Sequence, residues 1–370
     1  MPPRIFPADP RASYLAARDK FDEAVLRVLR SGTYILGPEL AAFESEFAQW
    51  LGAGGVVGVA NGTDAIELAL RAVGVGPGDL VATVGNTVTA TVAAIVAAGA
   101  KPVFVEVEGD TMLMNPDALR DVLEGADGKK VRAIVPVHLY GLACDMPRIV
   151  ELAEGHGAVV VEDCAQAHGA TVAGKKAGTL GRLAAFSFYP TKNLGAFGDA
   201  GAVAGTDSAL LARVKSLRQY GWGERYVSDE HGRNSRLDEI QAAILRVRLN
   251  MLETENAHRV TLAARYLERL ARAHLRLPVT ATGRMHAWHQ FVVRTSDRDG
   301  LKAHLEKCGI ICGILYPVPV YRQPAYRATP GLPITDEACA QVLSLPLHGG
   351  MSLADVDTVA ATVLDWEAAR

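Results

Sequence analysis

Residues 159–169 have the sequence VVVEDCAQAHG, in which an apolar run ends at an acidic pair. Consecutive valines are typical of a strand that is buried on both faces of a sheet. Polar residues after such a strand lie at its carboxyl end, where α/β proteins gather their ligands. Asp163 is therefore a candidate site residue. Its carboxylate would pair with a protonated ring nitrogen, bind magnesium, or only cap the strand end.

Similar short apolar runs lie on both sides of this stretch and alternate with segments of helical periodicity. The predicted strands are 80–84, 103–107, 133–137, 159–162 and 184–188. Helices are predicted at 61–73, where Ile66 and Leu70 share a face, and at 87–98, which ends at Gly99. Apolar strands separated by helices predict an α/β fold with a mostly parallel sheet that is covered on both faces.

The length of 370 residues predicts a large domain and a smaller one. A long helical pattern that begins near Leu237 is predicted to connect them. A strand at 288–294, a helix at 298–307 and a last helix after Ser352 predict a small α+β domain at the C-terminus. The predicted division is a large domain at 12–250 and a small domain at 251–370 that also includes residues 1–11.

The composition excludes several classes of protein. A net charge of −3 argues against a nucleic-acid-binding protein, which is usually basic. Neither a membrane-spanning apolar run nor the apolar core of a signal peptide is visible, so we expect a cytoplasmic protein. Five cysteines without close pairs argue against a disulfide framework. Cys308 and Cys312 have no second pair at zinc-like spacing, so no metal site is predicted.

Two further features follow apolar stretches. Gly62 and Thr63 open a predicted helix, whose free amides would attract a phosphate or would form an ordinary helix end without a ligand. Lys192 follows the strand that contains Ser187, 29 residues and one predicted helical crossover after Asp163. It is either a solvated surface lysine or an amine beside the same cleft that forms a Schiff base with an aldehyde.

Together these groups match the chemistry of pyridoxal 5'-phosphate (PLP). The phosphate needs amide and hydroxyl groups, which Gly62, Thr63 and Ser187 supply. The ring nitrogen needs a carboxylate to stay protonated, so that the ring withdraws electrons, and Asp163 supplies it. The aldehyde needs an amine, which Lys192 supplies. The order of these groups along one alternating α/β chain predicts a PLP enzyme.

The chain resembles the DegT–StrS family of nucleotide-sugar aminotransferases, which has the aspartate-aminotransferase-like fold (fold type I). The resemblance covers nearly the whole chain and is most specific in VVVEDCAQAHGA at 159–170 and SFYPTKNLGAFGDAGAVAG at 187–205. It also includes NGTDAIELAL, GAKPVFVEV, PVHLYG, NSRLDEIQAAIL and LSLPLH. The resemblance implies a large PLP-binding domain and a small C-terminal domain.

The resemblance also implies a role for each matching residue. Lys192 would hold PLP and move a proton between the substrate carbon and the cofactor. Asp163 would pair with the ring nitrogen, and Gln166 would bond the ring hydroxyl. Gly62, Thr63 and Ser187 would hold the phosphate. Asn234 resembles an asparagine that reaches the phosphate from the neighbouring subunit, which implies a homodimer with shared active sites.

Some positions depart from common family patterns. Val88 stands where an aromatic ring often stacks on the cofactor, so we expect altered cofactor affinity. Tyr321 stands where histidine is common, in a stretch that begins at Tyr316 and is expected near the substrate. Tyr189 precedes the lysine at a position where relatives vary. These three tyrosines would contact the sugar or diphosphate, with ordinary packing as the alternative for Tyr189 and Tyr321.

The likeness is strongest to the branch of the family that aminates carbon 3. It implies that the enzyme transfers the amino group of L-glutamate to a thymidine-diphosphate (dTDP)-linked 3-keto-6-deoxyhexose. A 4-aminotransferase for a UDP-, GDP- or dTDP-linked 4-keto sugar is the alternative. Related dehydratases carry histidine in place of Lys192. A non-enzymatic regulator with this fold would not need the set formed by Asp163, Gln166, Ser187 and Lys192.

Overall fold

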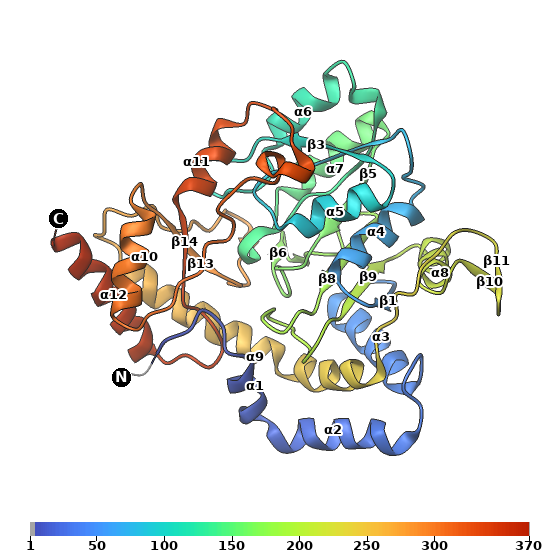
Figure 1. The fold of residues 1–370 in the computed structure, drawn as a ribbon, viewed down its shortest axis with the longest axis horizontal. Coiled ribbons are helices and arrows are strands. Elements are labelled where there is room, and N and C mark those ends of the chain that lie inside the picture. The colour runs from blue at the N-terminus through green and yellow to red at the C-terminus, as the bar shows by residue number, and fades with distance from the viewer. Residues whose placement is uncertain (1–3, 370) are drawn as a thin grey trace.

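The structure is a computed structural model that describes residues 4–369 (Figure 1). A seven-stranded sheet with the order β1–β9–β8–β5–β4–β2–β3 forms its centre. The strands are β1 (Gly55–Val59), β2 (Leu80–Val84), β3 (Lys101–Val105), β4 (Val131–Ile134), β5 (Val159–Asp163), β8 (Leu183–Ser187) and β9 (Gly201–Gly205). Strand β9 runs antiparallel to both of its neighbours, β1 and β8, and all other neighbouring pairs of this sheet are parallel. The predicted α/β class with a mostly parallel sheet is therefore confirmed.

Helices cover both faces of this sheet, because its strands are apolar on both sides. One face packs through a single apolar cluster on α4 (Gly62–Ala72), α5 (Thr89–Ala97) and α8 (Ser208–Leu217). The opposite face has two clusters. These clusters include α3 (Pro38–Leu51) and α9 (Glu239–Arg269) beside β1, and α6 (Pro116–Glu124) and α7 (Met146–His156) beside β4.

The connection between β5 and β8 differs from the predicted helical crossover. The two strands are parallel neighbours, as expected, but the chain between them forms the short strands β6 (Thr171–Val172) and β7 (Lys175–Lys176). Gly169, Gly174 and Gly178 have positive φ angles of 94°, 78° and 96° in this connection. A right-handed helix does not accept such angles, so the prediction of a helix here is wrong.

A second apolar core surrounds the C-terminal half of α9 (Figure 1). The N-terminal half of α9 packs on the sheet, so this helix connects the second core to the sheet. It contains β13 (Phe291–Arg294), β14 (Val342–Leu345), α10 (Arg298–Lys307) and α12 (Leu353–Ala368). Ile5 pairs with Ile310 and packs on this core, so the N-terminal segment lies beside the C-terminal elements. The domain limits at 250 and 251 stay a prediction. Residues 1–3 of the segment assigned to the small domain lie outside the described residues.

The other α-helices and strands do not belong to the central sheet. They are α1 (Pro10–Ala16), α2 (Arg18–Ser31), the β10 (Trp222–Glu224) and β11 (Val227–Ser228) hairpin, β12 (Arg284–Met285) and α11 (Pro333–Gln341). α2 packs along the outer side of α9, and the hairpin projects from the opposite end of the molecule from α10 and α12 (Figure 1). Within residues 4–369, no helix combines the length and the apolar character needed to cross a membrane.

Candidate active site

A cavity of about 370 Å³ lies at the carboxyl ends of the parallel strands. Its walls come from the segments that follow β1, β2, β5 and β8, and from the chain before β13 and after α10. This is the edge at which α/β sheets bind ligands. The predicted site residues that line it are Gly62, Thr63, Val88, Asp163, Gln166, Ser187, Tyr189, Lys192 and Tyr316.

One end of the cavity is built to hold an anion. Asn61 caps α4 by accepting a hydrogen bond from the N–H of Asp64 at 2.9 Å. The N–H groups of Gly62 and Thr63, in the first turn, have no acceptor among the described residues. A Cβ atom on Gly62 would lie 2.6 Å from the Cβ of Ser187, so only glycine fits against that serine. Free amides at a helix start beside a hydroxyl form a phosphate cradle.

Asp163 ends β5 deep in the cavity and is 3% exposed. Its Oδ2 accepts a hydrogen bond from the Thr91 hydroxyl at 2.9 Å, and its Oδ1 accepts one from the N–H of Ala165 at 3.1 Å. Burial raises the pKa of Asp163, against these two bonds and the charge of Lys192, which lower it. A cation placed in the cavity would therefore stabilise the ionised carboxylate.

Lys192 lies in a turn directly after β8, where its N–H donates to the Tyr189 carbonyl at 2.8 Å. Its Nζ donates a hydrogen bond to no residue within 4–369. Burial lowers the pKa of Lys192 from 10.5 to about 8, although the charge of Asp163 opposes this shift. A substantial fraction of this amine is thus neutral near physiological pH, as a nucleophilic lysine requires.

Gln166 and Tyr316 form a polar part of the wall. The Gln166 Oε1 accepts a hydrogen bond from the N–H of Tyr140 at 2.7 Å, which fixes the direction of the amide. Its Nε2 then donates to the Tyr316 hydroxyl at 3.1 Å. Burial raises the pKa of Tyr316 to about 12, so the phenol stays protonated. Val88 and Tyr189 are exposed and line the same cavity.

Two predicted site residues do not line this cavity. Tyr321 is buried against Phe104, and its hydroxyl donates to Asp336 Oδ1 at 2.8 Å. Its ring also packs on Gly85, at the end of β2, where a Cβ atom would come within 2.4 Å of the ring. Asn234 is exposed on the segment that joins the β10–β11 hairpin to α9. Tyr321 therefore supports the end of β2 in the structure.

The cavity is also lined by residues that were not predicted as site residues, among them His289, Gln290 and Asp199. Residues 288–290 were predicted to belong to a strand, whereas β13 begins at Phe291 and the residues before it form a loop. Asp199 lies in the turn between β8 and β9. A histidine and a glutamine just before an apolar run could have indicated site residues, but both were included in the predicted strand.

One buried trio has the residue types of a metal site. The possible ligand atoms of His138, Glu162 and Cys164 lie within 4.8 Å of one another. The carboxylate of Glu162, however, already accepts hydrogen bonds from three backbone N–H groups and lies 2.9 Å from His138 Nε2. The N–H of Cys144 donates to the other histidine nitrogen. Glu162 and His138 therefore belong to a hydrogen-bond network next to Asp163, in which their possible ligand atoms are already engaged.

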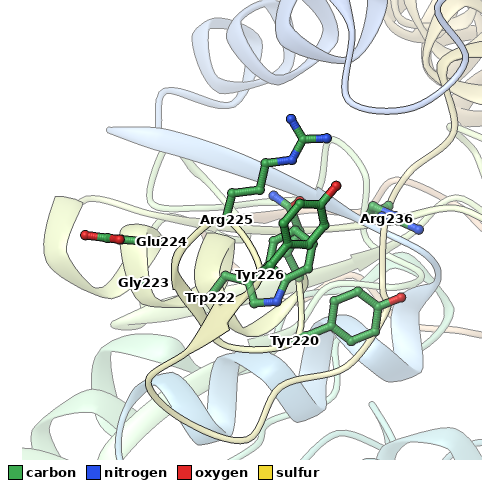
Figure 2. A pocket seen from close by; sticks show the side chains of 8 residues that line it. Tyr220, Trp222, Gly223, Glu224, Arg225, Tyr226 and Arg236 are labelled. Atoms are coloured by element: carbon green, nitrogen blue, oxygen red, sulfur yellow. The ribbon is translucent and has the colours of Figure 1, made fainter.

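A wider hollow of about 750 Å³ lies at the β10–β11 hairpin. Figure 2 shows the rings of Tyr220, Trp222 and Tyr226 gathered there, with Arg225 and Arg236 nearby. The Trp222 ring centroid lies 5.4 Å from that of each tyrosine, and Tyr226 is 73% exposed. This hollow has neither a buried carboxylate nor a lysine, so the candidate active site is the cavity at the strand ends.

Comparison with known proteins gives consistent matches over nearly the whole chain. The profile of the DegT/DnrJ/EryC1/StrS aminotransferase family matches residues 16–364. The dTDP-3-amino-3,4,6-trideoxy-alpha-D-glucose transaminase of Streptomyces venezuelae is 46% identical over 369 residues, which cover 98% of this chain and 96% of the relative. The UDP-N-acetyl-3-dehydro-alpha-D-glucosamine 3-aminotransferase of Acidithiobacillus ferrooxidans is 40% identical over 357 residues, which cover 96% of each.

A solved structure extends the likeness to three dimensions. The crystal structure of S. venezuelae DesV in complex with a ketimine intermediate superposes with a TM-score of 0.95. The two chains are 44% identical, and the match covers 98% of each. The fold class predicted from the sequence motifs, that of the PLP aminotransferases, is confirmed by this match.

Proposed function

The chain belongs to the DegT/DnrJ/EryC1/StrS aminotransferase family, and we therefore propose that it uses PLP to move an amino group from L-glutamate onto carbon 3 of a dTDP-linked 3-keto-6-deoxyhexose. The observation that carries this proposal is the cavity that joins Lys192, Asp163 and the free amides of α4. The two relatives described above are both named for an amino group at carbon 3, and the more similar one is named for a dTDP sugar.

The residues of the cavity fit PLP. The amides of Gly62 and Thr63 and the hydroxyl of Ser187 would hold the phosphate. The Ser187 Oγ accepts a hydrogen bond from the N–H of Tyr189 at 3.3 Å, which leaves its own proton free to donate. The buried carboxylate of Asp163 would hold a ring N–H, and the Nζ of Lys192 has no competing partner among the described residues. The phosphate, the ring nitrogen and the aldehyde of the cofactor thus each have a counterpart in the cavity.

When bound, PLP supplies an aldehyde that takes up the amino group and a ring that withdraws the electron pair left on a deprotonated carbon. Asp163 keeps the ring nitrogen protonated, which this withdrawal requires. Lys192 holds the cofactor at rest. Once its amine is released, the lone pair of Nζ takes the proton from the donor carbon and later delivers a proton to the sugar carbon. A pKa of about 8 suits both directions of this transfer.

The polar wall of the cavity would orient the sugar. Tyr316 is held by Gln166 and remains a phenol, so it donates its proton to a sugar or phosphate oxygen. Tyr189 stands exposed beside Lys192 and would form a second contact. A buried hydrogen-bonding partner rejects a substrate that leaves it unpaired, so a few such contacts suffice to select one ketone position. The position of Tyr321 outside the cavity removes it from this set of direct contacts.

We further propose that the enzyme is a homodimer with shared active sites. In a single chain, Asn234 is exposed and away from the cavity, so it would reach a phosphate only in the site of a second subunit. Large apolar side chains are also exposed in the cavity, on or beside the projecting hairpin, and in the loops after α2 and β8: Tyr34, Ile35, Val88, Tyr189, Phe197, Tyr220, Tyr226 and Val227. An obligate interface would cover such surface.

The test of this proposal is a half-reaction with matched lysine variants. PLP-loaded protein should lose its visible absorbance when glutamate is added and regain it with a nucleotide-linked keto sugar. Borohydride reduction should fix the cofactor to the peptide that contains Lys192. The Lys192→Ala variant should neither retain reduced cofactor nor turn over, whereas Lys175→Ala, at an exposed lysine, should behave as the wild type. Attachment to a different lysine would refute the assignment.

A further inference from the structure

His289 lies in the loop before β13 and lines the same cavity as Lys192. It is 4% exposed, and its Nδ1 lies 3.1 Å from the Oδ1 of Asn193. Asn193 is the residue that directly follows the lysine. The histidine ring is thus attached to the turn that carries the reactive amine.

The hydrogen bonds around Asn193 fix which of its atoms faces the histidine. The Asn193 Nδ2 lies 2.8 Å from the Ala287 carbonyl, which can only accept, so this atom is the amide nitrogen. It also donates to the Oδ1 of Asn256 at 2.9 Å. The Nδ2 of Asn256 in turn donates to the carbonyl of His168 at 2.8 Å. The carbonyls of Ala287 and His168 thus fix the orientation of both amides, and the oxygen of Asn193 faces His289.

This arrangement determines the tautomer of His289. An amide oxygen only accepts, so the Nδ1 of His289 carries the proton. Burial lowers the pKa of His289 well below its usual value, and the charges of Lys192 and Arg259 lower it further, so the ring is neutral. A neutral ring protonated at Nδ1 has its lone pair on Nε2. The Nε2 has no hydrogen-bond partner among residues 4–369 and remains an acceptor for the cavity.

Nζ of Lys192 and Nε2 of His289 line one cavity, and neither has a hydrogen-bond partner among the described residues. We propose that His289 is a positioning residue for Lys192: when the lysine side chain turns toward the histidine, Nε2 accepts a hydrogen bond from the free amine and directs that amine toward the substrate carbon. This inference rests on the proposed transamination. One N–H of the amine points to Nε2, and the lone pair of Nζ points away from the histidine. The proton leaves the carbon with its electron pair left behind, and Nζ becomes an ammonium that the same acceptor stabilises. His289 stays neutral throughout.

The other charged and titratable groups near the two residues are few. Asp163 on β5 and His168 after it face Lys192, and Arg259 of α9 and His286 also act on His289. On its other side, Lys192 lines a small cavity together with Asp9, Arg248, Arg259 and His348. None of these groups is an acceptor fixed by the Asn193 amide, so the effect of His289 can be separated from theirs by substitution.

Two variants separate the role of Nε2 as a hydrogen-bond acceptor from the role of the bond between Nδ1 and Asn193. In His289→Asn, the amide nitrogen takes the place of Nδ1 and keeps the bond to Asn193, but the acceptor at Nε2 is lost. In His289→Gln, the amide oxygen reaches the place of Nε2, but the bond to Asn193 is lost. Melting temperatures and circular dichroism would show that both variants fold.

The first measurement uses the cofactor-free protein, in which trace acetylation of Lys192 is followed against pH by mass spectrometry. His289→Asn should lower the midpoint by about one pH unit, because an ammonium loses a charge-assisted hydrogen bond. His289→Gln should restore it. In the holoenzyme, kcat should fall about tenfold in the Asn variant with the KM for glutamate unchanged, and recover in the Gln variant.

An Asn variant that titrates as the wild type would overturn the inference. Equal shifts in both variants would also overturn it, because they would assign His289 a purely architectural role. The proposed function fails by a different result, which is a wild-type holoenzyme that aminates no nucleotide-linked keto sugar. That result leaves the titration of Lys192 in the cofactor-free protein unaffected, so the two failures are distinguishable.

Discussion

Asp163 and Lys192 line the same cavity, and the carboxylate opposes the loss of charge that burial imposes on the lysine. The pKa of Lys192 is lower than that of a solvated lysine, and burial raises the pKa of Asp163. The pKa of each group is therefore shifted in the direction that favours its neutral form. A cavity that shifts two opposed groups in this way is typical of an active site.

The capture of PLP by the cofactor-free protein should follow the titration of Lys192. Because only the neutral amine attacks an aldehyde, the capture rate should rise with pH and level off above about 8. Asp163→Asn should move this midpoint to lower pH, since it removes the negative charge that favours the ammonium. Stopped-flow absorbance would measure both. A wild-type midpoint near 10.5, the ordinary value, would contradict the account.

Asp163→Asn should also separate activity from stability. Turnover should fall by several orders of magnitude, because the ring nitrogen loses the carboxylate that keeps it protonated. The pKa of Asp163 is raised on folding, so the folded state binds the extra proton and stability falls as pH rises through that raised pKa. At pH 9, where Lys192 is largely neutral, the cofactor-free variant should therefore melt above the wild type. A lower melting temperature would show that the ionised carboxylate stabilises the empty site.

The substitution Tyr321→Phe tests the role of this residue in the structure. It keeps the ring against Gly85 and Phe104 and removes the hydrogen bond to Asp336. We expect a loss of about 1 kcal/mol in the free energy of unfolding, with the KM for the sugar unchanged. Tyr316→Phe is the matched variant, and it should raise that KM. A higher KM in the Tyr321 variant would return this residue to the substrate site.

Mixed subunits test the proposed shared site. The Lys192→Ala homodimer should be nearly inactive, and the Asn234→Ala homodimer should have reduced activity. If Asn234 serves the opposite subunit, a heterodimer of the two variants places both defects in one site and leaves the other site intact. Activity should then return on mixing, toward half of the wild-type value per dimer. No gain of activity in a verified heterodimer would place Asn234 and Lys192 in the same subunit's site.

Much of the fold follows from the sequence because its strands are continuous apolar runs. The predicted strand at 80–84 and the helix at 298–307 coincide with β2 and α10. The predicted strands at 103–107 and 133–137 begin two residues after β3 and β4 begin. The apolar pattern continues beyond these strands into buried loops, so periodicity alone does not mark where hydrogen bonding ends.

The candidate site was predictable where a residue directly follows a strand or begins a helix, as Asp163, Lys192 and Gly62 do. It was not predictable where a residue enters from a distant loop. His289 comes from the chain before β13, and the position of Tyr321 depends on packing against Gly85 across the fold. Such contacts are set by tertiary structure, which no local pattern encodes.

The amination of defined sugars tests the central claim most directly. The PLP-loaded enzyme would be given glutamate and, separately, dTDP-linked 3-keto and 4-keto 6-deoxyhexoses, with UDP- and GDP-linked keto sugars as comparisons. NMR would locate the new amine. We predict preferred turnover of the dTDP-linked 3-keto sugar, with the amine at carbon 3. Preferred turnover of a 4-keto sugar would contradict the assignment of carbon 3, and turnover of none would contradict the proposed function itself.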